Sequence, residues 1–408
     1  MTDAARRGLA LNRRGILTAA AFLPLVNVAR AQGTPATIRI GAPNSMTGGF
    51  GEGGRNVAAG LQVAAEQINL RGGIKALGGA KLEILPADTT SDDPATAASV
   101  TRRLITQDKV AVLVGAHTST MTLSAQIEAE RGEVPILTTS YSDQIVQRGY
   151  KYTFKVAPQA SVLAQEGFDD IVALYQELKQ KKVQRVAIFY GADAASQSIG
   201  KAYAEIAKKA GAQVVATSTF SGNLADPTSV VGPVLQSKPD VLFLNAFVND
   251  TILITRALRS LGIMIPIIGS GSGISVKTLG QTLGKQGDNL MGTLAWNWDL
   301  PTPGSKEFGV LYHAKYPDEP FAPQEAGEGF AVGEIIAAAI EKAASADPKK
   351  IRDALMQTNV QSVLPGGPVS FGENGMRNNS IGILVSWIDG KLRTVYPKED
   401  STISPALP

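Results

Sequence analysis

The feature that most constrains the fold is an alternation of short, β-branched apolar runs with longer segments of helical period. Each run has the length and composition of a buried strand, and each longer segment repeats apolar residues along one helix face. Such alternation predicts parallel strands joined by crossover helices in a doubly wound α/β sheet. The first series has expected strands at 37–42, 81–87, 110–114 and 134–138 and helices at 57–69, 94–108 and 121–131.

The same alternation begins again beyond an extended connector at 150–159. Two successive open sheets predict two Rossmann-like lobes rather than one barrel. Segments after residue 290, including an apolar helix at 324–344 and a strand at 381–388, can belong to either lobe. The second series has expected helices at 164–180, 200–210, 230–237 and 251–262 and strands at 185–190, 213–220, 241–246 and 266–269.

The first 31 residues have the composition of an export signal. A basic stretch with Arg13 and Arg14 precedes an apolar segment too short to span a bilayer, and Ala29-Arg30-Ala31 fits a cleavage site after Ala31. The adjacent arginines leave both the twin-arginine and the general secretory route open. The mature chain is therefore expected in the periplasm and not to span the membrane.

Composition excludes several classes of function. Removing five arginines and one aspartate with the signal leaves 34 basic and 35 acidic residues of the original 39 and 36, which gives no reason to expect a nucleic-acid partner. The chain has no cysteine, and its two histidines, His117 and His313, have no ligand spacing. No metal site or cofactor is therefore expected.

A candidate binding site lies in residues 110–124, where an apolar strand leads into a hydroxyl-rich turn and then a helix. The unpaired N–H groups at a helix N-terminus favour a small anion such as a carboxylate. The alternative is that Ser119 or Thr120 only caps the helix.

Three further patterns each have a functional and an ordinary interpretation. Gly49–Gly54 forms a GxGxxG, but the strand ends several residues earlier than a dinucleotide-binding turn requires. Trp296 and Trp298 can stack on a ligand or pack a core. Glu325 and Glu328 lie near the start of a helix, where complementing the helix dipole is the ordinary explanation.

The order of motifs resembles the periplasmic leucine/isoleucine/valine-binding proteins, the receptors of hydrophobic amino acid ABC importers. The likeness covers nearly all of the mature chain and includes IRIGAPNSMTGGFGEGG, VAVLVGAHTSTMTLSAQ and VPILTTSYSD. It implies the type I periplasmic binding protein fold, with two lobes joined by three crossovers that close on the ligand. Lobe one would hold 33–156 and 299–378, and lobe two 157–298 and 379–408.

The resemblance also implies ligand-binding positions. Ser119 and Thr120 match a serine pair that holds the ligand's carboxylate, and Ser140 and Ser142 match the second carboxylate loop. Gly53 replaces an aromatic residue, which is expected to open space, and the acid that neutralises an α-ammonium falls near Gly271. The remaining candidates are Phe50, Gln197, Phe247 and Trp296.

The resemblance implies a non-catalytic, monomeric solute-binding protein that serves a membrane permease. The ligand is a small carboxylate, either a hydrophobic amino acid or, because the acid near Gly271 is lost, an aromatic or other organic acid. Two alternatives are an exported nucleotide-binding enzyme that uses the glycine-rich loop and a sensor with the same two lobes.

Overall fold

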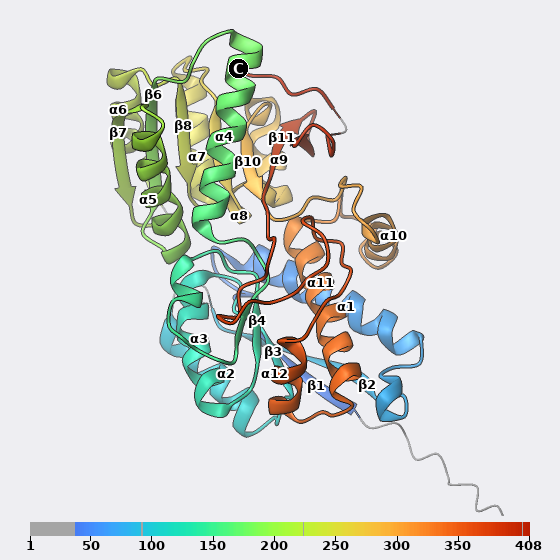
Figure 1. The fold of residues 1–408 in the computed structure, drawn as a ribbon. Coiled ribbons are helices and arrows are strands. Elements are labelled where there is room, and N and C mark those ends of the chain that lie inside the picture. Colours follow the sequence, from blue (N-terminus) through green and yellow to red (C-terminus); the bar gives the residue numbers. More distant parts are fainter. Residues whose placement is uncertain (1–36, 91–92, 223, 402) are drawn as a thin grey trace, which may run out of the picture. The chain divides into compact units, whose positions relative to one another are not determined.

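The computed structural model describes residues 37–90, 93–222, 224–401 and 403–408 (Figure 1). The predicted export signal, residues 1–31, lies outside the described residues. Within them the chain forms two sheets with helices on both faces, as the alternation predicted.

The first sheet is wholly parallel, with strand order β2-β1-β3-β4-β5. Its two short strands β3 and β4 are completely buried, which agrees with their continuous apolar sequence. The strands are β1 Thr37–Asn44, β2 Lys81–Asp88, β3 Val112–Val114, β4 Ile136–Thr138 and β5 Thr153–Lys155.

The helices that pack with this sheet come from both ends of the sequence. In Figure 1 the orange α11 lies beside the blue α1, and the two helices pack closely. We call this sheet with its helices lobe one. The helices are α1 Gly51–Leu70, α2 Pro94–Thr106, α3 Ser119–Gly132, α10 Ser305–Lys315, α11 Gln324–Ala343 and α12 Pro348–Leu355, with short 3₁₀ turns at Lys75–Leu77 and Asp143–Val146.

The glycine-rich segment forms the first turn of α1 instead of the predicted loop before it. A Cβ atom on Gly54 would collide with the carbonyl oxygen of Ser45, and one on Gly53 would collide with the imidazole of His117. These glycines allow close packing of protein atoms, so the space that a pyrophosphate would need is filled.

The second sheet, lobe two with its helices, has the order β12-β11-β10-β9-β8-β6-β7. Its strands are β6 Arg185–Gly191, β7 Gln213–Phe220, β8 Val241–Asn245, β9 Ile267–Ser270, β10 Met291–Leu294, β11 Ile383–Ile388 and β12 Lys391–Tyr396. Its helices are α4 Ala160–Lys179, α5 Ala194–Lys209, α6 Thr228–Ser237, α7 Val248–Ser260, α8 Ser272–Ser275 and α9 Lys277–Leu283, with a 3₁₀ turn at Gly284–Gly287.

Strand β12 was not predicted. It pairs antiparallel with β11 across a tight turn in which Asp389 and Gly390 have φ of 48° and 72°. Asp-Gly between two apolar runs is a strong hairpin signal, so the sequence contained the information.

The chain passes between the two sheets three times: after β5, after β10 and before β11. Two of these crossings lie side by side, because Lys155 N donates to Gly375 O and Arg377 N donates to Lys155 O, both at 2.9 Å. The two-lobed fold class is confirmed, and the exact lobe boundaries stay a prediction.

We predict that Gly60→Ala destabilises the protein by about 1–3 kcal/mol, because the added methyl group overpacks the contact between α1 and α11. A Cβ atom at this buried glycine would collide with the carbonyl group of Ala326. Gly309→Ala on α10, where a Cβ atom meets nothing within 4 Å, is the control and should stabilise by up to about 1 kcal/mol. Urea denaturation of both variants measures the effects, and equal stabilities would contradict this packing.

Candidate functional site

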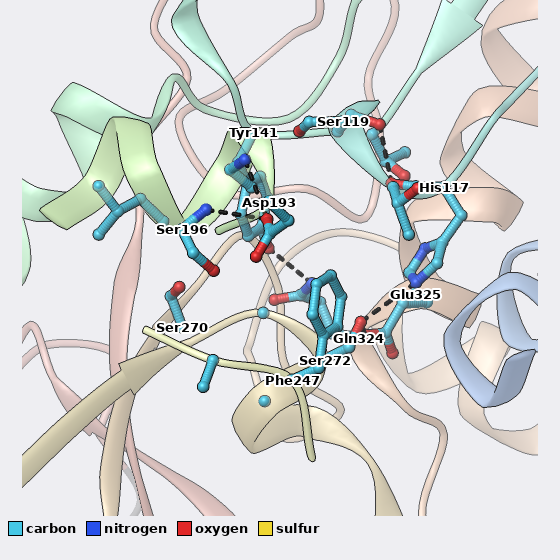
Figure 2. A pocket seen from close by; sticks show the side chains of 18 of the residues that line it. His117, Ser119, Tyr141, Asp193, Ser196, Phe247, Ser270, Ser272, Gln324 and Glu325 are labelled. Carbon is cyan, nitrogen blue, oxygen red and sulfur yellow. Dashed lines mark hydrogen bonds between the residues drawn. The ribbon is translucent and has the colours of Figure 1, made fainter. Parts of the chain in front are cut away.

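A cavity lies where the carboxyl ends of strands from both lobes face each other (Figure 2). Its volume is about 50 Å³, well below the roughly 300–1,000 Å³ that is usual for small-molecule sites, so the cavity walls lie close together in this arrangement. Lobe one contributes His117, Thr118, Ser119, Thr139, Ser140, Tyr141, Gln324, Glu325 and Glu328. Lobe two contributes Asp193, Ala195, Ser196, Ile199, Ala246, Phe247, Ser270, Gly271, Ser272 and Gly273.

The N-terminus of α3 faces this cavity, and the side chain of its N-cap residue, Thr118, makes no capping hydrogen bond. Its buried Oγ1 has no hydrogen-bond partner within the described part of the chain. The hydroxyl and the first-turn N–H groups are therefore available to an anion.

Ser119 and Ser140 line the cavity but their hydroxyls also organise it. Ser119 Oγ accepts from Ser142 N at 3.0 Å, which joins the α3 turn to the loop after β4. Ser140 Oγ donates to His117 O at 2.8 Å and lies 2.7 Å from Thr122 Oγ1. These bonds hold the loop after β3 against the loop after β4.

His117 forms part of one cavity wall, and its imidazole is expected to be uncharged at neutral pH. Its Nε2 lies 3.3 Å from Ser272 Oγ of lobe two, and burial lowers its pKa to about 4. The imidazole occupies the space beside Gly53. The expectation that Gly53 opens the cavity is therefore wrong, because a histidine fills the position.

Two acids of α11 line the cavity with one free oxygen each. Glu325 Oε1 accepts from Ser272 Oγ at 2.9 Å and Ser275 Oγ at 2.6 Å, and Glu328 Oε2 accepts from Gln324 Nε2 at 3.2 Å. Glu325 Oε2 and Glu328 Oε1 are buried and have no partner among the described residues. Burial raises the pKa of both carboxyls. The helix-dipole explanation is therefore insufficient, since both side chains are buried against the cavity.

Asp193 supplies a third acid, from lobe two. Its Oδ1 accepts from Ala195 N and Ser196 N, both at 3.0 Å, so it caps α5 while lining the cavity. Burial raises its pKa, and these hydrogen bonds act in the opposite direction.

Two buried cations lie near the cavity but are not among its lining residues. Lys155 Nζ donates to Ser140 O and, at 2.9 Å, to Pro158 O, and burial lowers its pKa to about 7. Arg377 donates to Pro365 O, and burial lowers its pKa to about 10. Among the described lining residues none is Lys or Arg.

Four of the predicted ligand-binding residues line the cavity: Ser119, Ser140, Phe247 and Gly271. Gly271 has φ of 50°, which disfavours side chains there, and a Cβ atom would lie 2.8 Å from the Tyr141 ring. The Tyr141 ring of the opposite lobe therefore occupies the space into which a side chain at position 271 would project.

The other predicted residues lie elsewhere. Thr120 and Ser142 join the lobes: Thr120 Oγ1 accepts from Ala194 N at 3.3 Å, and Ser142 Oγ lies 3.1 Å from Ser198 Oγ. Phe50 stacks on Phe247 with 3.7 Å between ring centroids. Gln197 donates to Ala192 O at 2.6 Å and is not among the lining residues.

The prediction that Trp296 contacts the ligand is wrong. Trp296 is fully buried, its Nε1 donates to Ser305 Oγ at 3.2 Å, and its ring packs edge-on against Phe308. Trp298 Nε1 donates to Leu392 O at 2.8 Å. The two tryptophans follow the end of β10, so strand geometry does not put them on one face and neither lines the cavity.

Sequence reasoning missed Tyr141, Ser196 and Gln324 and assigned no binding role to His117. Gln324, Glu325 and Glu328 share one face at i, i+1 and i+4 of a helix start, which was a usable signal. Nothing in the sequence indicated that this helix start returns to the loops after β3 and β4. Across the residues described, no cluster of three or more His, Cys, Asp or Glu side chains could hold a metal ion.

The fold and the two-sided cavity define a two-lobed solute-binding protein. The model of the periplasmic binding protein family matches residues 37–391, and the chain belongs to that family. It is 26% identical over 375 residues to the Leu/Ile/Val-binding protein homolog 8 of Brucella abortus, covering 89% of this chain and 91% of the relative.

Two solved structures share the fold. The branched-chain amino acid transporter substrate-binding protein LivJ of Streptococcus pneumoniae, in complex with isoleucine, has a TM-score of 0.77 and 24% identity, covering 87% of this chain and 97% of that one. An ABC transporter solute-binding protein of R. palustris, in complex with benzoate, has a TM-score of 0.77 and 17% identity over 91% and 99%. In the described chain, no helix has the length and apolarity needed to cross a membrane.

We predict that His117 makes the stability of the protein depend on pH. Its pKa of about 4 in the folded protein lies below the ordinary 6.5, so the contribution is full above pH 6.5 and is lost as pH falls towards 4. His117→Asn, which tolerates the φ of 59° at this position, should remove that dependence.

The measurement is the free energy of unfolding of wild type minus variant between pH 4 and 7. The difference should shrink as pH falls, and a constant difference would show that His117 does not stay neutral in the fold. His313→Asn controls for loss of a histidine outside the cavity.

Proposed function

We propose that this protein is the substrate-binding component of an ABC importer and that it captures a small amino acid between its lobes. The observation that carries the proposal is that one cavity contains both a helix N-terminus whose N-cap side chain makes no hydrogen bond and several acidic side chains. Thr118 and the start of α3 suit the ligand's carboxylate, and Asp193 and Glu325 suit its ammonium.

The acids favour one of the two ligand classes that the sequence left open. An amino acid needs an anionic partner for its ammonium, since a buried unpaired charge is costly. The acid missing at Gly271 is supplied by Glu325 from α11 and by Asp193 from the loop after β6. The named relatives of Brucella and the isoleucine complex of LivJ support the same class.

An aromatic acid is the second candidate. The stacked rings of Phe50 and Phe247, and the benzoate complex of the R. palustris relative, favour it. Glu325 and Glu328 in the lining disfavour it, because an anionic ligand supplies no donor for their unpartnered oxygens.

Binding would stabilise the closed arrangement because each lobe holds a different part of the ligand. Direct contacts between the lobes would stabilise the same closed arrangement. They join Ser142 with Ser198 and Phe50 with Phe247. We infer a monomeric, non-catalytic receptor in the periplasm that presents its closed form to a membrane permease. We also propose lobe boundaries near residues 156, 298 and 378.

A thermal-shift screen of the mature protein against L-amino acids, benzoates, aliphatic acids and nucleotides tests the proposal. Ligands that bind only the folded state raise its stability by about 2.7 kcal/mol at a hundredfold excess over Kd. A shift by amino acids supports the proposal, and shifts by nucleotides alone or by benzoates alone contradict it.

We predict that Thr118→Val weakens binding of the best amino acid of that screen by roughly tenfold, because a hydroxyl that donates to the ligand's carboxylate is lost. Stability without ligand should be unchanged or slightly higher, since this hydroxyl is buried and makes no bond in the fold. Thr255→Val removes another buried hydroxyl without a partner in the described chain, on α7 outside the cavity, and is the matched control. Calorimetric titration of the three proteins measures the effect, and equal affinities would remove Thr118 from the site.

A further inference from the structure

Helix α11 has two carboxylate oxygens without a hydrogen-bond partner in the described chain. This is more than the single ammonium of a simple amino acid requires. Glu325 and Glu328 are each 1% exposed and lie three residues apart on one helix face. One oxygen of each side chain is held by protein donors, and the other, Glu325 Oε2 or Glu328 Oε1, has no partner in the described chain. Both residues line the cavity between the lobes.

The acidic side chains around the cavity outnumber the buried cations beside it. Glu325, Glu328 and Asp193 line it, and the cations Lys155 and Arg377 both act on Glu328; Lys155 also donates to the carbonyl of the lining residue Ser140. Glu52, whose Oε2 accepts from Thr278 Oγ1 at 2.5 Å, adds a further negative charge close enough to act on Glu325. The single ammonium of a zwitterionic ligand can pair with Asp193 or Glu325 and leaves Glu328 Oε1 without a donor.

The rest of the lining has few aliphatic side chains. The side chains of Ser196, Ser270 and Ser272 surround the lobe-two part of the cavity, and Ile199 is the one branched aliphatic residue among the described lining residues. Figure 2 shows Ser272 and Glu325 beside each other with Gln324 nearby. An aliphatic side chain here would bury the free carboxylate oxygens without supplying a donor, which is unfavourable.

We propose that the ligand is a cationic amino acid whose side-chain ammonium or guanidinium is bound by Glu325 and Glu328. The inference rests on the proposed function, which provides for the ligand's α-carboxylate and α-ammonium. Glu325 and Glu328 then determine specificity: they favour a second cation over a methyl group of the same size.

The test is calorimetric titration with two pairs of ligands of matched length, L-lysine with L-norleucine and L-ornithine with L-norvaline. Wild type should bind the cationic member of at least one pair about tenfold or more tightly than its neutral partner. Glu328→Gln and Glu325→Gln should each reduce that ratio towards one. Glu334→Gln is the control, because Glu334 lies on the same helix but pairs with Arg71 at 3.8 Å outside the cavity, and it should leave the ratio unchanged.

The outcomes separate this inference from the proposed function. Equal or tighter binding of norleucine and norvaline overturns the cationic specificity while the amino acid receptor stands. If 1,5-diaminopentane binds as tightly as lysine, the acidic pair is supported and the carboxylate site on α3 is wrong. If no amino acid binds, both the cationic specificity and the proposed function are wrong. Retained norleucine binding by the glutamine variants shows that they fold.

Discussion

The side-chain amide of Gln324 is the interaction on which the cavity depends. Its Nε2 donates to Tyr141 Oη at 2.7 Å and to Glu328 Oε2 at 3.2 Å, and its Oε1 accepts from Ala295 N at 3.0 Å. One buried side chain thus ties the start of α11 to the loop after β4 and to the crossing after β10. Loss of this amide would leave buried groups unsatisfied, at about 1–3 kcal/mol each. The same amide positions Glu328, whereas Glu325 is held by Ser272 and Ser275.

Buried charge is concentrated where the lobes are joined. Lys155 and Arg377 lie on neighbouring crossings, and both act electrostatically on Glu328. Buried charged groups lower the stability of a core, and they cluster at functional sites, where their charge contributes to binding or catalysis. Glu328 also lines the cavity, so a charged ligand bound there would act on the same carboxyl as these cations. This coupling gives a physical route from ligand binding to lobe closure.

The sequence predicted what depends on local pattern. The alternation gave both sheets, and residues at the ends of predicted strands, such as Ser119 and Phe247, do line the cavity. Contacts between distant segments could not be predicted this way. The role of Glu325 depends on α11 returning to lobe one, the space at Gly53 depends on His117, and Trp296 lies in the core because Phe308 packs on it. The acid absent at Gly271 therefore could not be located from the sequence.

The most direct test of the central claim is a crystal structure of the mature protein with the amino acid that raises its melting temperature most. The account predicts the ligand's carboxylate within about 3 Å of Thr118 Oγ1 and the first N–H groups of α3, and its nitrogen atoms against the carboxylates of Asp193, Glu325 or Glu328. A ligand carboxylate bound away from α3, or a nitrogen that contacts none of these acids, would contradict it.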